Sequence, residues 1–523
     1  MKLKSTWIAS CSFFIPIVGC AVSNDDSSRG DGNIQEDAIT EATSPAQFGA
    51  CPSDIAANDP NVKCATIQVP IDYSKPFGEK LSIMISKAAA TDPAHRKGAF
   101  LINRGGPGIG ALGSASARSK ALPEVHAQYD FIGFDPRGVG HSTPIHCDAN
   151  FWQLPMPDPT APEYRDVNWK LYTGYAKSCA DNAGKYVQHM DIETQVRDLD
   201  AIRAALGESK INYLGVGWGT YLGAMYGTTF PNRVARMILS GNMNPDGIYY
   251  GHFRSTVPAS EVDLHGWFAW IAKYDSVFHL GDTHDKVEAS YRGVLASVTE
   301  KPQSTVGPFE LTDLMFFAAY TKDRWAYVAS ALSDFVVRGD ASKLIEAVGV
   351  PDEGVNAAFT GTICSNGPFS HDRNWWDRDR AELAKSAPYL GWYYTWFLTP
   401  CASWAFPQKV PPAITGGRLP PILMFNSIGD PSMPYEGALR MHDTLPSSRL
   451  VSIKDVTTNG FGWPDFGDSP AATKIGIDYL VNDIVPAEDV TVEGTPEPNP
   501  TAARAMTMRP LAHDRPSFGA LPH

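Results

Sequence analysis

Residues 211–226 read INYLGVGWGTYLGAMY, and this stretch sets the fold expected for the whole chain. An apolar run typical of a strand ends at Val216, and a helical run begins at Trp218. A strand that enters a glycine-bounded turn and then a helix normally presents a nucleophile at the centre of a G-x-S-x-G motif. The centre here is Gly217, so the turn lacks the side chain that it usually displays.

Apolar and amphipathic segments alternate on both sides of this turn. The runs GAFLIN (98–103) and YDFIGFD (129–135) are typical of buried strands. Asp191 is suited to cap a helix whose apolar residues follow helical spacing as far as Gly207. This alternation predicts an α/β fold with a mostly parallel, doubly wound sheet that is covered on both faces.

The composition changes between residues 246 and 415, where aromatic side chains are dense and recur at helical spacing. Strands are predicted again in PPILMFNSIGDP (420–431) and RLVSIKDV (449–456). We therefore predict a helical cap, or lid, inserted between two core parts, 49–245 and 416–486. Such a cap would lie over the carboxyl ends of the strands, where open α/β sheets bind ligands. For any single tryptophan of the cap, ordinary core packing is the favoured role over ligand contact.

The N-terminus is typical of an export signal over residues 1–20. Lys2 and Lys4 precede an apolar run that is too short to span a bilayer with ease. The run ends in Ile-Val-Gly-Cys, which resembles a bacterial lipobox and makes Cys20 the predicted lipidation site. The alternative is an ordinary secretory signal with a chance cysteine. Both interpretations predict an exported protein, and the first adds membrane contact through the lipid anchor alone.

Two further segments near the ends carry few large apolar residues. Residues 21–48 are rich in Asp, Ser, Gly and Glu, and residues 487–523 are rich in Pro, Ala and Thr. Burial of such segments releases little free energy to offset the entropy lost on ordering. We therefore predict a flexible linker at 21–48 and a Pro-rich tail at 487–523.

The cysteine count agrees with an oxidising compartment. Eight cysteines, less Cys11 in the signal and Cys20 at its end, leave six in the mature chain. Order and spacing favour the following pairs, although the sequence alone permits other connectivities: Cys51–Cys64, Cys147–Cys179 and Cys364–Cys401.

Composition also limits the classes of partner. The chain has 44 Lys and Arg against 57 Asp and Glu and shows no basic stripe, so nucleic acid is not expected as a partner. Neither a C-x-x-C pair nor an H-E-x-x-H motif occurs, so the sequence supports no metal site, and no cofactor is expected.

Several motifs together resemble the secreted tripeptidyl-aminopeptidase branch of the α/β-hydrolase fold, which is related to proline iminopeptidases. The resemblance extends from about residue 51 to 486. It is carried by CATIQVPIDYSKP, INRGGPG, YDFIGFDPRGVGHSTP, the segment 197–239 around the turn, PCASW and GDPSMPYEGALRM. The resemblance implies an exported serine hydrolase that acts on peptides or related amides and esters, with a triad in the order Ser, Asp, His.

This chain departs from the family at two of the three triad positions. The serine position falls on Gly217, the acid on Asp430, and the histidine on Thr458, which has Asn459 beside it. Neither glycine nor threonine can supply the nucleophile and the base that acyl transfer needs. Asp430, left without its histidine, is expected to pair with Thr458, Asn459 or water.

The oxyanion hole consists of backbone groups and is expected to remain. By resemblance, the N–H groups of Gly106 and Trp218 would converge on one oxygen of a ligand. Three hypotheses follow. The first is a pseudohydrolase that binds a peptide-like or small acyl ligand, or a protein partner. The second is a non-hydrolytic enzyme that uses Asp430 on a small metabolite. The last is an active peptidase or esterase with a displaced site, for which His141, His442 and His513 offer no obvious base.

Overall fold

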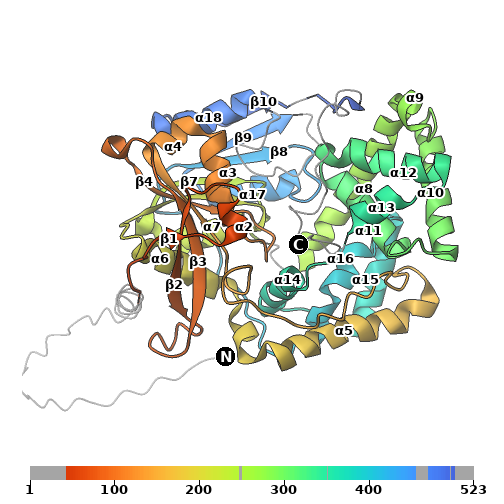
Figure 1. Ribbon diagram of the computed structural model, residues 1–523, viewed down its shortest axis with the longest axis horizontal. Coiled ribbons are helices and arrows are strands. Elements are labelled where there is room, and N and C mark those ends of the chain that lie inside the picture. The colour runs from red at the N-terminus through yellow and green to blue at the C-terminus, as the bar shows by residue number, and fades with distance from the viewer. Residues whose placement is uncertain (1–42, 247–249, 350, 455–468, 495, 501–523) are drawn as a thin grey trace, which may run out of the picture.

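A ten-stranded sheet forms the centre of the molecule (Figure 1). The computed structural model describes residues 43–246, 250–349, 351–454, 469–494 and 496–500. The strand order in the sheet is β1-β2-β3-β5-β4-β6-β7-β8-β9-β10. The strands are β1 (Gly49–Ala50), β2 (Lys63–Pro70), β3 (Lys80–Ala88), β4 (Gly98–Asn103), β5 (Tyr129–Phe134), β6 (Ile211–Val216), β7 (Val234–Ser240), β8 (Ile422–Ser427), β9 (Ser448–Lys454) and β10 (Val490–Glu493).

The strands from β5 to β10 in this order are parallel to one another, and β1, β2 and β3 add an antiparallel edge. Side chains along β4 alternate between two apolar layers. Leu101 joins one layer, while Phe100 and Ile102 join the other. The predicted α/β fold with a mostly parallel, doubly wound sheet is confirmed.

Helices cover both faces of the sheet. On one face lie α3 (Ser114–Ala121), α4 (Pro123–Gln128) and α18 (Pro470–Val481), and on the other lie α6 (Ile192–Ala205), α7 (Trp218–Thr229) and α17 (Tyr435–Thr444). The predicted bounds of α6 are confirmed, because the Asp191 carboxylate accepts the Thr194 N–H at 3.2 Å and Gly207 follows with φ +72°.

The inserted segment between β7 and β8 is helical. In Figure 1 its helices lie to the right of the sheet. Those with described bounds are α8 (Tyr250–Lys273), α9 (Asp275–Phe278), α10 (His284–Glu300), α11 (Pro308–Tyr320), α12 (Trp325–Arg338), α13 (Ser342–Val348), α14 (Glu353–Ser365), α15 (Arg373–Ser386) and α16 (Tyr393–Leu398). These helices fall within the predicted cap, 246–415. Trp267 and Trp270 are completely buried, which agrees with core packing.

One helix of the first core part also packs with the cap. Helix α5 (Arg165–Asn182) precedes β6 in sequence, but its Tyr172 ring stacks on Trp396 of α16 at 5.7 Å. The Trp396 indole N–H donates to the Pro159 carbonyl at 2.8 Å. The cap therefore consists of two segments of the chain, the inserted segment 246–415 and the region around α5. The predicted boundary at residue 246 covers only the first of these.

The structure corrects the start of the predicted tail. Residues Val490–Glu493 form β10 and pair in parallel with β9. The Asp489 carboxylate also accepts the Leu450 N–H at 2.9 Å. A four-residue edge strand carries too short an alternating pattern to stand out from a Pro-rich context, and the sequence therefore predicts a Pro-rich tail over all of 487–523.

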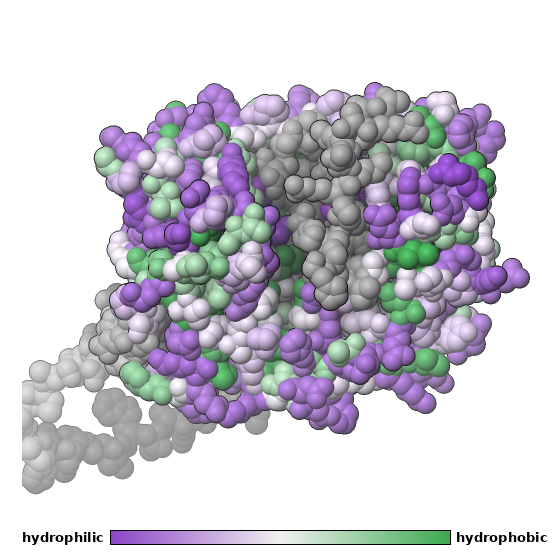
Figure 2. Space-filling view, in the orientation of Figure 1, coloured by the Kyte–Doolittle hydropathy of each residue, from purple (hydrophilic) through white to green (hydrophobic). Residues whose placement is uncertain are grey.

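All three predicted disulfides form, which are Cys51–Cys64, Cys147–Cys179 and Cys364–Cys401. Within the residues described, no helix combines the length and the apolar character needed to cross a membrane. In Figure 2 hydrophilic residues cover much of the coloured face, and apolar residues lie among them.

Candidate functional site

The turn at Gly217 keeps the backbone that a nucleophile normally occupies. Gly217 has φ 53° and ψ −117° and precedes the first residue of α7. Its N–H donates to the Ser240 carbonyl at 3.1 Å, and its own carbonyl accepts the Thr220 hydroxyl at 2.6 Å. A residue with a side chain would be strained in this conformation, whereas glycine adopts it at little cost.

The glycines around the turn allow close backbone approach. A Cβ at Gly215 would lie 2.2 Å from the Gly219 carbonyl oxygen, and one at Gly219 would lie 2.7 Å from the Asn103 amide oxygen. A Cβ at Gly105 would lie 2.2 Å from the Val216 carbonyl oxygen. At Gly217 the nearest atom to a Cβ, among the residues that the structure describes, would be the terminal methyl of Met433, at 3.2 Å. Of the described side chains, only this flexible one limits the space for a small side chain at Gly217.

The loop expected to supply the oxyanion hole lies against this turn. Asn103 ends β4, and its amide oxygen accepts the Gly105 N–H at 2.8 Å. A Cβ at Gly105 would lie 3.2 Å from the Trp218 nitrogen, so the two predicted donor segments are adjacent. Gly106 has φ +106° and is joined to Pro107 by a cis peptide bond. The Trp218 side chain is 2% exposed, and its indole N–H has no partner among the described residues.

Asp430 lies at the same edge of the sheet, in the turn that follows β8. Its carboxylate is buried and accepts the N–H groups of Ser432 at 3.0 Å and Met433 at 2.8 Å. Because Met433 also faces the Cβ position of Gly217, the acid and the vacant nucleophile position share one site. The predicted partners Thr458 and Asn459 lie outside the described residues, as do Cys20 and His513.

Helix α8 places a line of buried polar side chains over this edge. They recur at helical spacing and comprise His252, Thr256, Ser260 and Asp263. The Ser260 hydroxyl donates to the Pro431 carbonyl at 3.4 Å, which joins the cap to the Asp430 turn. The sequence analysis predicts the aromatic residues of this helix but not the line of polar residues. The helical spacing of those polar residues is nevertheless present in the sequence.

Asp263 is the member of this line that bears most on the site. It is 6% exposed, and its Oδ2 has no partner among the described residues. The pKa of Asp263 is raised from its ordinary 3.8 to about 8, mainly by burial and also by the charge of Asp430, while Lys322 opposes the shift. The charges of Asp430 and Lys322 therefore both act on Asp263, which belongs to the helix that contacts the Asp430 turn.

His252, at the start of the line, makes the stability of the protein depend on pH. Burial lowers the pKa of His252 from 6.5 to about 4. Above pH 6.5 the imidazole is neutral in both the folded and the unfolded protein, and the stability of the fold is highest. As the pH falls toward 4, the imidazole of the unfolded chain takes up a proton and the free energy of unfolding decreases. We expect a slope of up to about 1.4 kcal/mol per pH unit in this window.

Replacing His252 with Phe should remove that slope. Urea unfolding of both proteins at several pH values between 4 and 7 measures it. The variant should gain stability relative to the wild type as the pH falls. Parallel curves for the two proteins would show that His252 is not held neutral by burial.

A displaced triad was the last of the predicted alternatives, and one Ser-His-Asp constellation does occur. The His442 imidazole contacts the Ser448 hydroxyl through Nδ1 at 2.7 Å and the Asp489 carboxylate through Nε2 at 3.0 Å. Ser448 is inaccessible, and its hydroxyl lies 2.6 Å from the Leu445 carbonyl oxygen. It also begins β9, so it lies at the amino ends of the parallel strands, whereas Gly217 follows the carboxyl end of its strand. These contacts hold the turn between α17 and β9 together and do not present Ser448 as a nucleophile.

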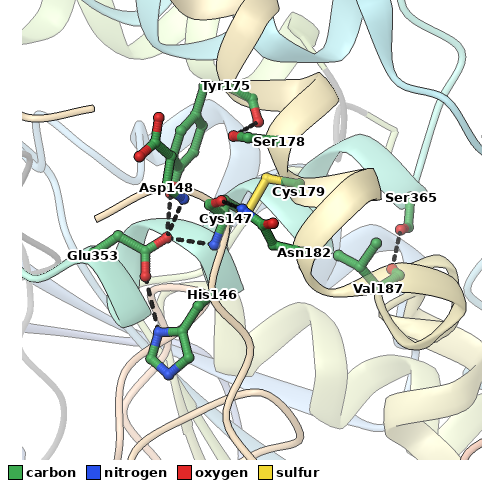
Figure 3. The surroundings of a disulfide bond; sticks show 10 residues. All are labelled: His146, Cys147, Asp148, Tyr175, Ser178, Cys179, Asn182, Val187, Glu353 and Ser365. Atoms are coloured by element: carbon green, nitrogen blue, oxygen red, sulfur yellow. Dashed lines mark hydrogen bonds and ion pairs between the residues drawn. A yellow bond between two sulfur atoms is a disulfide. The ribbon is translucent and has the colours of Figure 1, made fainter. Parts of the chain in front are cut away.

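The Cys147–Cys179 disulfide lies beside the start of a further cap helix, α14 (Figure 3). Glu353, at the start of α14, accepts the Cys147 N–H at 2.6 Å and the Asp148 N–H at 3.1 Å. Its second oxygen lies 2.9 Å from the His146 imidazole. A Cβ at Gly108 would lie 2.9 Å from the Val355 carbonyl oxygen, so α14 packs directly on the predicted oxyanion loop.

Comparisons with known proteins agree with this architecture. The sequence profile of the alpha/beta hydrolase fold matches residues 98–463. Tripeptidyl aminopeptidase of Streptomyces coelicolor is 37% identical over 421 residues, which cover 76% of this chain and 77% of that protein. Serine protease Hip1 of Mycobacterium tuberculosis is 27% identical over 492 residues, which cover 86% of this chain and 91% of that protein.

Among solved structures, the proline iminopeptidase of Mycobacterium smegmatis aligns with 80% of this chain and 98% of that chain. The two share 13% sequence identity, and the TM-score is 0.36.

Proposed function

The chain belongs to the α/β-hydrolase family, in the branch of the tripeptidyl aminopeptidases, and from this premise we propose that it is an exported pseudohydrolase. It binds a peptide-like or small acyl ligand at the vacant turn and does not cleave it. The observation that carries the proposal is Gly217, which stands in the backbone conformation of a nucleophile without any nucleophilic atom.

The missing base supports the same conclusion. Residues 455–468, which follow β9 and include the family's histidine turn, contain no histidine. Residues 455–468 therefore offer no imidazole to take the proton of a water molecule at the vacant turn near neutral pH. In this proposal Asp430 does not take the place of that group: its Oδ1 accepts two N–H groups of its own turn and so holds the turn in place.

The remaining groups favour binding of a peptide amino terminus. Backbone N–H groups at Gly106 and Trp218 would receive a carbonyl oxygen of the ligand. Asp263 lies on the same line of helix α8 as Ser260, and its Oδ2 has no partner among the described residues. Because burial raises its pKa to about 8, a ligand ammonium would also favour the ionised carboxylate that accepts its hydrogen bonds. The tripeptidyl aminopeptidase relative, by its name, acts on peptides from the amino end.

Export is part of this proposal. The basic and apolar residues of segment 1–20, and a cysteine at its end, suit a lipoprotein signal. Three disulfides are typical of a chain that folds in an oxidising compartment.

Calorimetry with a tripeptide tests the proposal. The wild type should bind a tripeptide with a free amino terminus, bind its N-acetylated form at least about tenfold more weakly, and release both intact by mass spectrometry. Asp263→Asn should weaken binding of the free tripeptide, whereas Glu346→Gln, on the exposed face of the cap, should not. Cleavage of the peptide, or equal affinity for the two forms, would contradict the proposal.

One observation favours the non-hydrolytic enzyme as the second candidate. Asp263 and Asp430 bring two buried carboxyl groups close enough for the charge of one to act on the other. Such a pair suits proton transfer to and from a small metabolite. A compound that is turned over by the wild type but not by Asp430→Asn would establish this function in place of simple binding.

A further inference from the structure

Two histidines and a glutamate meet on the cap, outside the candidate site. His265 belongs to α8, and His284 and Glu288 belong to α10. One potential ligand atom from each residue lies within 4.8 Å of the other two. We propose that these three residues bind a divalent transition-metal ion, of which Zn²⁺ is the first candidate. The ion would link α8 to α10. The proposal is independent of the function proposed above.

The spacing of the three groups suits a metal ion. Nδ1 of His265 lies 2.9 Å from Nε2 of His284, and the two rings stack with centroids 5.1 Å apart. Zn–N bonds of about 2.0–2.1 Å in a tetrahedral site place neighbouring ligand atoms roughly 3.3 Å apart. Small side-chain rotations would therefore bring the two nitrogens onto one ion. His284 and Glu288 stand four residues apart, on one face of α10.

The second atom of two of the ligands, His284 and Glu288, has a hydrogen-bond partner that would orient it, and that of His265 faces a carboxylate at longer range. Nδ1 of His284 lies 3.0 Å from the Asp285 carboxylate, and this leaves Nε2 directed at His265. The Tyr389 hydroxyl donates to Oε1 of Glu288 at 2.6 Å, which leaves Oε2 available. Nε2 of His265 lies 3.9 Å from the Glu261 carboxylate. Metal-binding histidines in proteins usually have such a partner on the other ring nitrogen.

The type and exposure of the ligands indicate which ion and which coordination. Two imidazoles and one carboxylate are the ligand set that Zn²⁺ shares with neighbouring divalent transition metals, whereas Ca²⁺ and Mg²⁺ prefer oxygen atoms. The side chains of His265, His284 and Glu288 are 36%, 34% and 20% exposed, so an ion can enter from solution. The open side leaves a fourth position for water.

A simple hydrogen bond between the two imidazoles is the competing explanation. It accounts for the 2.9 Å contact but requires no third group. It also predicts that glutamine at either position preserves the contact, whereas glutamine is a poor ligand for Zn²⁺. No motif in the sequence indicates the site, because His265 and His284 lie in different helices and outside any zinc motif.

Zinc titration of the untagged full chain, followed by competition with a chromophoric chelator, tests the proposal. The wild type should bind one Zn²⁺ per chain, and its melting temperature should rise in Zn²⁺ and return in EDTA. His265→Gln and His284→Gln should each weaken binding at least about tenfold. His95→Gln, an exposed histidine outside the cap, serves as the matched control.

Circular dichroism without metal shows whether each variant is folded, and Co²⁺ gives a second readout. The wild-type Co²⁺ complex should absorb in the visible range, with the intensity typical of a four-coordinate site, and the two cap variants should lose this band. Saturable one-to-one binding that both folded glutamine variants keep unchanged would overturn the proposal. So would the absence of any saturable site in the wild type.

Discussion

A chain that carries both Gly217→Ser and Thr458→His should hydrolyse an activated ester or a tripeptide anilide at least about 100-fold faster than the wild type. The reason is that the turn at Gly217 already has the backbone of a nucleophile, with φ 53° and ψ −117°. Among the described residues, a serine Cβ there would meet the flexible methyl of Met433, at 3.2 Å. Asp430 stands at the acid position, and the predicted backbone donors lie beside the turn.

Two controls separate restored chemistry from other effects. Gly217→Ser alone should stay far below the double variant, because no base would take the proton of the hydroxyl. Gly217→Ala with Thr458→His imposes the same backbone strain, on the order of 1 kcal/mol, without a hydroxyl and should be inactive. Gly217→Ser with Asn459→His tests the neighbouring position for the base. If both serine–histidine variants fold and neither gains activity, the site is placed wrongly.

Asp198→Ala should lower the free energy of unfolding by about 3–5 kcal/mol, because it removes one partner of a buried ion pair. The Asp198 carboxylate accepts Nε and Nη2 of Arg137, both at 2.6 Å, and the Arg137 side chain is inaccessible to solvent. Arg137 also donates to the Pro70 and His189 carbonyls. Without Asp198, a buried guanidinium would keep its charge and lose its counter-ion.

Urea unfolding followed by tryptophan fluorescence measures this loss. Asp478→Ala is the matched control, because Asp478 pairs with Lys474 on the surface of α18. Exposed pairs of this kind contribute about 0–1 kcal/mol. A loss below about 1 kcal/mol for Asp198→Ala would mean that Arg137 is solvated or finds another partner.

The sequence predicted the core of this fold well, because the core follows short-range rules. The strand over 98–103, the cap residue Asp191 and the turn at Gly217 each depend on local pattern and backbone preference. The three disulfides followed from order and spacing. The short edge strand β10 was missed, since its order comes from pairing with β9 rather than from its own residues.

The cap side of the site could not be predicted, because it depends on how helices pack. Asp263 belongs to the candidate site because α8 packs against the Asp430 turn, and this packing is not visible in the sequence. His265 and His284 are separated by the end of α8, the short α9 and a turn, and only the packing of α8 on α10 brings them together. Contacts between helices have no signature at a fixed spacing in the sequence.

If the turn at position 217 has no nucleophile, a fluorophosphonate has no serine to modify there. Intact-mass analysis of the purified wild type after exposure to this reagent, with an active serine hydrolase treated in parallel, tests this. We expect an unmodified wild-type mass while the active enzyme is fully labelled. A wild-type adduct approaching one phosphonyl group per chain would contradict it.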